Sequence, residues 1–474
     1  MAATPDTAAT SASTRDDARS DKDKTADGDG SMWLNNTGVC VGLIPYRRTL
    51  GTLFLLIVTP IVPVLLWWVI QRQDGDLARV AGVFAAEGGR GVMAFVREVP
   101  SPVDVRAWQI IGCFIGLALG LTRLIPCKMY KGPPSPTGYR NTYHANGVEY
   151  FLLMNALFVG GSQFGLGLYN GGILYDHYGE ILSALTVFAL LFCLMLYVKG
   201  ITFPSSKDSG TTDNPMFDFF YGTELYPNIL GWDVKQFTND RFGLTWWAIA
   251  CLSFACKQYE TFGYVSDAML ISVCLQWIYL LKFFVWETGY FCTMDIQHDR
   301  AGYYICWGCM VWVPSVYTSS AHWCVMHPIT IGIPLTAMCL FLGAFFIWVN
   351  YDSDRQRQVF RATSGEAMVW GRKPQMIVAT YRTEAGELKQ SLLLASGWWG
   401  LARHFHYLPE ILAALMWAPP VTLSYILPYF YTVYLTILLL DRAYRDDARC
   451  ASKYGKDWAK YQEKVPYRIV PFVL

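Results

Sequence analysis

The segment from Ser391 to Glu410 concentrates residues that can do chemistry directly beside an apolar stretch. It holds two adjacent tryptophans, two glycines, an arginine, two histidines and a tyrosine. A polar, aromatic segment next to membrane-grade hydrophobic sequence is costly unless it lines a cavity that holds something polar. We therefore expect this segment to form one wall of a functional site.

Basic residues gather in 352–390 and again after residue 441. Beside a membrane, such residues ordinarily set topology or contact anionic lipid head groups. The stretch Asp446–Gly455 is different, because it mixes anionic, cationic, small and aromatic residues, as a site for a charged, flat cofactor would. Tyr454 and Tyr461 are seven positions apart and would share a face if both lay on one helix.

Two stretches with specific spacing carry a resemblance to a known family. They read Leu393-Leu-x-Ser-Gly-Trp-Trp-Gly-x-x-Arg-His-x-x-Tyr407 and Arg445-Asp-x-x-x-Cys-x-x-Lys-Tyr-Gly-x-x-Trp-x-x-Tyr461. Both resemble signatures of the sterol reductase family of the endoplasmic reticulum, whose members reduce ring double bonds with NADPH. The resemblance covers roughly residues 40–474.

The resemblance implies an NADPH site built from three parts of the chain. Arg357 and Arg361, four apart on a predicted helix end, would fork onto phosphate and favour NADPH over NADH. Trp399 would offer a face to the adenine or nicotinamide ring, and Arg403 and His404 are secondary phosphate contacts. The implied cofactor-binding residues are Arg357, Arg361, Leu394, Trp399, His406, Tyr407, Asp446, Cys450, Ala451, Ser452, Lys453, Tyr454 and Tyr461.

The family's chemistry also requires an acid, because an electron-rich ring diene accepts hydride only after protonation. The resemblance assigns catalysis to Tyr279 and Asp446. A single tyrosine in a membrane span is more often an interface residue. Burial would raise the pKa of Asp446 and suit it to be a proton source or relay. Glu287, Asp295, His298 and Asp299 are alternative relay members; their spacing would also admit a metal, which we do not expect.

Two stretches predict which ring bond is reduced. Trp370–Gly386 resembles an insertion typical of the family branch that acts on the C7–C8 bond, and Arg403–Glu410 resembles plant-type members of that branch. We therefore predict NADPH-dependent reduction of the C7–C8 double bond of a sterol, from delta-5,7 to delta-5. The alternatives are the C14–C15 branch, a methyltransferase of the isoprenylcysteine type that uses S-adenosylmethionine, and a non-catalytic sterol-binding scaffold.

The composition predicts an all-α polytopic membrane protein of about ten transmembrane helices. Apolar residues make up 53% of the 474 residues and charged residues only 16%. About 20 apolar residues are needed to cross a 30 Å hydrocarbon core. Stretches of that length lie near 51–70, 107–126, 150–169, 180–199, 244–263, 268–286, 303–323 and 328–350, and 408–440 predicts two short helices broken around Ala418-Pro-Pro420.

The remaining segments predict loops, a hairpin and three divisions of the chain. Segments 127–147 and 201–240 have the composition of loops. Residues 375–382 and 388–394 alternate as two strands of a small cytosolic β-hairpin. We divide the chain into a disordered N-terminal tail (1–31), a transmembrane sterol-binding half (32–350) and a C-terminal membrane-embedded NADPH-binding half (351–474).

The net charge and the positions of the cysteines limit which partners and which cellular compartment we expect. A net charge of +1 gives no steering toward nucleic acid, and thirteen cysteines lying mostly in apolar stretches do not form a disulfide framework. The aromatic share of 16% is most simply explained by interfacial belts of tryptophan and tyrosine. The positive-inside rule places both basic segments in the cytosol. The expected partners are a sterol, the lipid bilayer of the endoplasmic reticulum and, by resemblance, other enzymes of sterol biosynthesis.

Overall fold

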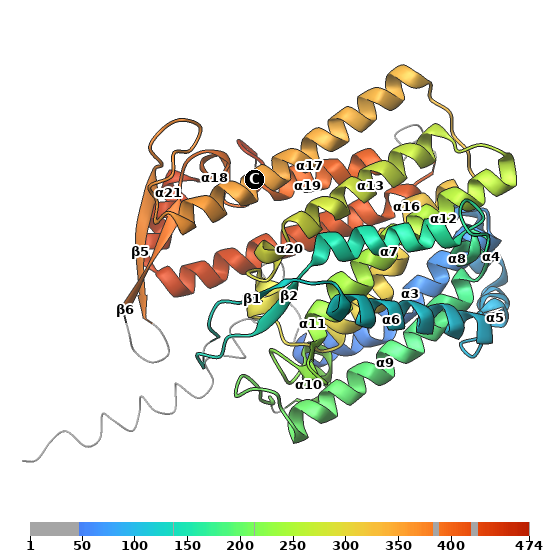
Figure 1. Ribbon diagram of the computed structural model, residues 1–474, viewed down its shortest axis with the longest axis horizontal. Helices are drawn as coiled ribbons and strands as arrows, with labels where there is room; N and C mark the ends of the chain where they lie inside the picture. Colours follow the sequence, from blue (N-terminus) through green and yellow to red (C-terminus); the bar gives the residue numbers. More distant parts are fainter. Residues whose placement is uncertain (1–46, 136, 213, 383–387, 419–424, 474) are drawn as a thin grey trace, which may run out of the picture.

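The computed structural model describes residues 47–135, 137–212, 214–382, 388–418 and 425–473. The predicted tail, 1–31, lies outside these residues. The helices lie side by side in one bundle, and β5, β6, α18 and α21 gather at one end of it (Figure 1). The helical elements are η1 (Arg47–Gly51), α3 (Thr52–Arg72), α4 (Leu77–Glu87), α5 (Gly89–Glu98), α6 (Val105–Leu124), α7 (Gly147–Gly161), α8 (Ile173–Asp176), α9 (Tyr178–Thr202), α10 (Pro215–Tyr221), α11 (Val234–Gln236), η2 (Phe237–Leu244), α12 (Thr245–Phe262), α13 (Asp267–Val285), α14 (Glu287–Tyr290), α15 (Met294–Gln297), η3 (Tyr303–Tyr317), α16 (Ser319–Cys324), α17 (Ile333–Ala362), α18 (Trp398–Leu401), α19 (Tyr407–Trp417), η4 (Leu427–Tyr429), α20 (Phe430–Tyr454) and α21 (Lys456–Lys464).

Five helices in the described residues are long and apolar enough to cross a membrane. Side-chain caps begin two of them: the Asp104 carboxylate accepts the Ala107 N–H at 2.8 Å before α6, and the Ser266 hydroxyl accepts the Met269 N–H before α13. The five are Thr49–Arg72, Val105–Leu124, Tyr178–Thr202, Asp267–Val285 and Ile333–Ala362, which match five of the predicted spans. The predicted number of ten is not confirmed.

The other predicted spans have a different local structure. Stretch 303–323 forms η3, a π-helix that contains Pro314, followed by the short helix α16. α12 ends in two polar turns that include Lys257 and Glu260, and Gly263 stops it in the left-handed conformation with φ +77°. α7 and α19 are shorter apolar helices. α19 ends at Trp417 and η4 begins at Leu427, and Pro419 and Pro420 of the predicted break lie outside the described residues. α20 then runs through the basic segment as far as Tyr454.

The predicted hairpin is confirmed, and two further small sheets stand where the sequence predicted loops. β5 (Met376–Arg382) and β6 (Leu388–Leu394) pair antiparallel, with Ala379 opposite Ser391. β1 (Lys128–Lys131) pairs with β2 (Thr142–Ala145), and β3 (Asn228–Ile229) pairs with β4 (Trp232–Asp233). Segment 201–240 also contains α10, α11 and part of η2, so it is a folded connection rather than an open loop.

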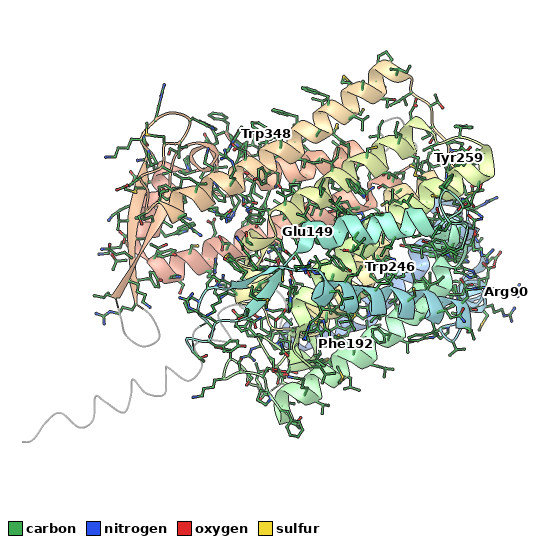
Figure 2. The ribbon with its side chains drawn as sticks, viewed as in Figure 1. Arg90, Glu149, Phe192, Trp246, Tyr259 and Trp348 are labelled. Atoms are coloured by element: carbon green, nitrogen blue, oxygen red, sulfur yellow. The ribbon has the colours of Figure 1, made fainter. Side chains whose placement is uncertain are left out.

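Tryptophan builds the core to a degree that the composition did not predict. The largest fully buried side chains include Trp68, Trp246, Trp247, Trp307, Trp323 and Trp417. Figure 2 shows Trp246 among the helices, whereas Trp348 projects outward from α17, where it is 53% exposed. The interpretation that most tryptophans form interfacial belts was therefore wrong for these six, because flat indole rings fill the gaps between neighbouring helices.

Candidate functional site

A cavity of about 350 Å³ lies where α13, α17, α19 and α20 meet the hairpin and α21. Its walls include charged side chains from three long helices, an unusual feature inside a helical membrane bundle. The predicted site residues that line it are Tyr279, Arg357, Arg361, Leu394, Trp399, His406, Tyr407, Asp446, Cys450, Tyr454 and Tyr461. The fold thus brings together residues that are up to 182 positions apart in the chain, the separation of Tyr279 and Tyr461. A cavity assembled from such distant segments depends on the packing of the bundle and not on any one local motif.

 

The two arginines lie on the last turns of α17, as predicted, and both face the cavity. The Arg357 guanidinium lies 4.1 Å from the centre of the Trp399 ring and 3.3 Å from Asp354. The Trp399 indole N–H donates to the Ser353 carbonyl at 2.8 Å, which fixes the ring against α17. A cation stacked on a fixed aromatic ring is held in place without losing its charge. The arrangement can receive an anionic group at the end of α17.

Arg403 holds the site together. Its guanidinium forms a fork with Asp447, with nitrogen–oxygen distances of 3.1 and 3.0 Å, and it also donates to the carbonyls of Val465 and Pro466. The Arg403 and His404 amides donate to the carbonyls of Tyr467 and Arg468. Although Arg403 lines the cavity, these contacts occupy its donors. Its main role in the structure is to tie the 391–410 segment to the C-terminal residues.

The C-terminal segment divides into residues that line the cavity and residues that do not. Ala451, Ser452 and Lys453 are exposed and lie outside the lining. The Lys453 ammonium lies 4.1 Å from the centre of the Tyr381 ring on the hairpin. Tyr454 and Tyr461 do not share a helix, because Gly455, with φ +50°, ends α20 and starts α21. The Tyr461 hydroxyl reaches the Leu394 carbonyl at 3.0 Å, so both of these predicted residues meet at the cavity wall.

Asp446 differs from the prediction in its ionisation. Burial alone would raise the pKa of its carboxyl, but nearby cations, chiefly Arg449 at 2.5 Å and also Arg357, lower that pKa below its usual value. The expectation of a raised pKa was therefore wrong. Asp446 is a carboxylate at neutral pH, which suits it to balance positive charge and makes it a poor proton source.

Tyr279 lines the cavity from α13. Its hydroxyl donates to the Glu410 carboxyl at 3.1 Å. Its ring packs against Trp247 and Trp417, with centroid distances of 5.9 and 5.4 Å. These two buried tryptophans do not line the cavity; they fix the Tyr279 ring, so that its hydroxyl is held in place at the cavity wall.

Residues 46–474 match the ergosterol biosynthesis ERG4/ERG24 family. This chain belongs to that family of sterol reductases. It is 50% identical over 420 residues to the 7-dehydrocholesterol reductase of Arabidopsis thaliana, covering 88% of this chain and 96% of that protein. It is 36% identical over 426 residues to a delta(14)-sterol reductase of Methylotuvimicrobium alcaliphilum, covering 88% of this chain and 93% of that protein. The family expected from the sequence is confirmed.

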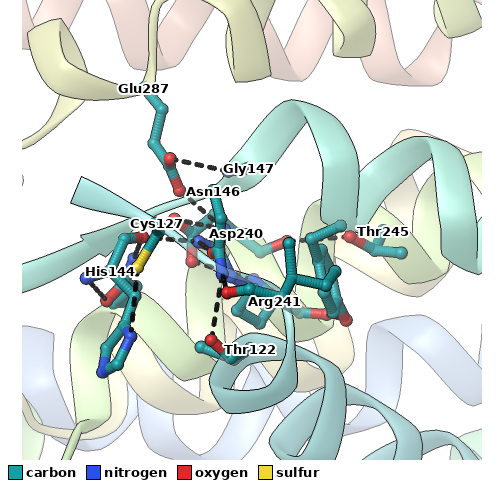
Figure 3. A network of polar contacts seen from close by, with 12 residues as sticks. Thr122, Cys127, His144, Asn146, Gly147, Asp240, Arg241, Thr245 and Glu287 are labelled. Carbon is teal, nitrogen blue, oxygen red and sulfur yellow. Dashed lines mark hydrogen bonds and ion pairs between the residues drawn. The ribbon is translucent and has the colours of Figure 1, made fainter. Parts of the chain in front are cut away.

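The alternative relay residues of this sterol reductase have separate positions. Glu287 belongs to a buried network outside the cavity lining, in which it lies 2.6 Å from Arg241 and accepts the Gly147 N–H at 2.9 Å (Figure 3). Arg241 also lies 3.2 Å from Asp240. Asp295 lines the cavity and pairs with Arg442 at 3.0 Å. His298 and Asp299 do not line it. Glu287 therefore stabilises the start of α7 and has no path to Tyr279 through these contacts.

Sequence reasoning missed four polar residues around Tyr279. They come from α13, α17 and α19. Three of them lay in predicted spans or in the basic segment, and Glu410, the last residue of the predicted 391–410 wall, was given no role of its own. A charged residue in a membrane span is a strong functional signal, and Lys282 in particular carried it. The four residues are Lys282, Asn350, Asp354 and Glu410.

Proposed function

We propose that this chain reduces the C7–C8 double bond of a delta-5,7-sterol with NADPH, in the membrane of the endoplasmic reticulum. The identity to the Arabidopsis 7-dehydrocholesterol reductase supports the bond, since it exceeds the identity to the delta(14)-sterol reductase, 50% against 36%. The single observation that carries the chemistry is one cavity lined both by Arg357 and Arg361 and by Tyr279, whose hydroxyl meets Glu410.

The polar end of the cavity fits a dinucleotide phosphate. Arg357 and Arg361 offer two cations, and burial holds the pKa of His404 and of His406 below the usual value, so both rings are neutral donors or acceptors. Among the described residues, the buried His406 Nδ1 has no hydrogen-bond partner, which leaves it able to bind a polar ligand group. NADPH would supply the hydride when bound here.

The part of the cavity around Tyr279 fits the protonation step. Tyr279 would donate its hydroxyl proton to the ring diene, which makes the ring carbon electrophilic enough to accept hydride. Trp247 and Trp417, which are buried and do not line the cavity, would hold the Tyr279 ring and so orient that hydroxyl. Asp446, as a carboxylate, would balance the positive charge of Arg449 and Arg357. The basic ends of α17 and α20 support a cytosolic cofactor site by the positive-inside rule.

The test is reduction in isolated membranes. The chain is expressed in cells that lack this sterol reductase, and membranes are given 7-dehydrocholesterol with NADPH, and in parallel a delta-14 sterol. Loss of the conjugated diene from the first sterol alone supports the proposal. Reduction of the delta-14 sterol alone would assign the chain to the other branch. Transfer of a methyl group from S-adenosylmethionine, or sterol binding without turnover, would overturn reductase function.

A further inference from the structure

Glu410 is the direct partner of the Tyr279 hydroxyl. The two residues meet across α13 and α19, and the Glu410 Oε1 accepts the hydroxyl at 3.1 Å. Both side chains line the cavity. In the described part of the chain, no cation forms an ion pair with Glu410. A buried carboxyl without an ion pair favours its neutral, protonated form.

The charged groups around Glu410 are fixed by other contacts. Lys282 lies one turn after Tyr279 and donates to the Asn350 side chain, and Asn350 in turn donates to the His406 carbonyl at 2.8 Å. Asp354 pairs with Arg357, and Arg442 pairs with Asp295. Lys282 therefore sits near Glu410 without neutralising it. It is placed to stabilise negative charge that develops on Glu410.

We propose that Glu410 is a proton-relay residue that resupplies Tyr279 during sterol reduction; this rests on the proposed function. The Tyr279 O–H bond breaks as a C–H bond forms on the sterol ring. The Glu410 O–H bond breaks as the phenol O–H re-forms, which leaves a carboxylate facing Lys282. The hydride supplies both electrons of the reduction, and water in the cavity returns one proton to Glu410 in each turnover.

The relay removes a chemical difficulty of Tyr279 acting alone. A carboxylic acid is about a million-fold stronger acid than a phenol in water. Protonation of a carbon–carbon double bond that ends with a carboxylate is therefore far more favourable than one that ends with a buried phenolate. In the alternative, Glu410 only orients the tyrosine ring and exchanges no proton.

The experiment compares Glu410→Gln and Glu410→Asp with the wild-type protein in membranes. Glu410→Gln keeps size and hydrogen bonding but carries no exchangeable acid, so we expect the turnover number to fall roughly 10²- to 10⁴-fold. The KM for NADPH should change less than about twofold, since Arg357 and Arg361 are untouched. The turnover number of Glu410→Asp should be at least tenfold higher than that of Glu410→Gln. Glu149→Gln on the exposed surface of α7 is the matched control.

The pH profile separates a relay from an orienting role. Wild-type turnover should fall as rising pH removes the Glu410 proton. In the Glu410→Gln variant, this decrease of turnover at high pH should be absent. The titratable groups that face Glu410 are unchanged in both variants; they are Tyr279, Lys282, Asp354, Tyr407, Tyr431 and Arg442. An unchanged decrease of turnover at high pH in Glu410→Gln, or Glu410→Asp no more active than Glu410→Gln, overturns the relay. Absence of sterol reduction by the wild-type protein would instead overturn the proposed function.

Discussion

Replacing Arg357 and Arg361 with glutamine should abolish the preference for NADPH over NADH. The two nucleotides differ by one 2′-phosphate, and the two guanidinium groups lie together at the end of α17. Glutamine keeps a polar side chain of similar length but removes the charge. The Trp399 ring, held by the Ser353 carbonyl, stays in place in the double variant.

The size of the effect follows from the contacts. Each charge-assisted hydrogen bond contributes about 1.5–3 kcal/mol, so the pair contributes about 3–6 kcal/mol. Moving Arg357 from its partly exposed pair with Asp354 costs up to about 1 kcal/mol. The net loss of about 2–5 kcal/mol corresponds to roughly 30- to 4,000-fold weaker NADPH binding, at 1.4 kcal/mol for each factor of ten. NADH affinity should change less than about threefold.

The assay is titration of detergent-solubilised protein with each nucleotide, read by tryptophan fluorescence. Arg355→Gln is the matched control, because Arg355 lies on the same helix, its side chain is 55% exposed, it pairs with Asp352 at 2.7 Å and it does not line the cavity. Equal weakening of NADPH and NADH in the double variant would refute the reasoning. The arginines would then serve general phosphate attraction or membrane topology.

Three further predictions follow from the same geometry. Tyr279→Phe keeps the ring and should lower turnover by roughly 10²- to 10⁴-fold at saturating NADPH with cofactor affinity retained; wild-type turnover would reduce Tyr279 to a packing residue. Arg403→Gln leaves Asp447 buried with one partner fewer and should lower unfolding stability by about 3–5 kcal/mol, seen as a lower melting temperature in detergent; an unchanged melting temperature contradicts the structural role of Arg403. Deleting residues 2–31 should leave expression and turnover unchanged, and a loss of turnover at normal protein level would show that the tail contributes to the enzyme.

The sequence determined the features that depend on residues close together in the chain. The spacing of Arg357 and Arg361 placed both on one helix end, and the alternation in 376–394 gave a hairpin, as the structure confirms. The family signatures are likewise local strings of specific residues. Such features survive without tertiary information because helix and strand geometry fixes the direction of nearby side chains.

Tertiary packing decided which groups meet, and therefore their charge state and role. Arg449, three residues away on α20, lowers the pKa of Asp446 locally, and packing adds His404 and Arg357 from other segments, which the sequence alone could not predict. Gly455 separated Tyr454 from Tyr461, although both still reach the cavity. Glu410 meets Tyr279 from 131 positions away. Hydrophobic patterning in the sequence locates apolar stretches one at a time. Electrostatic interactions and hydrogen bonds join groups that are close in space but distant in the chain, so only the folded bundle shows these pairings.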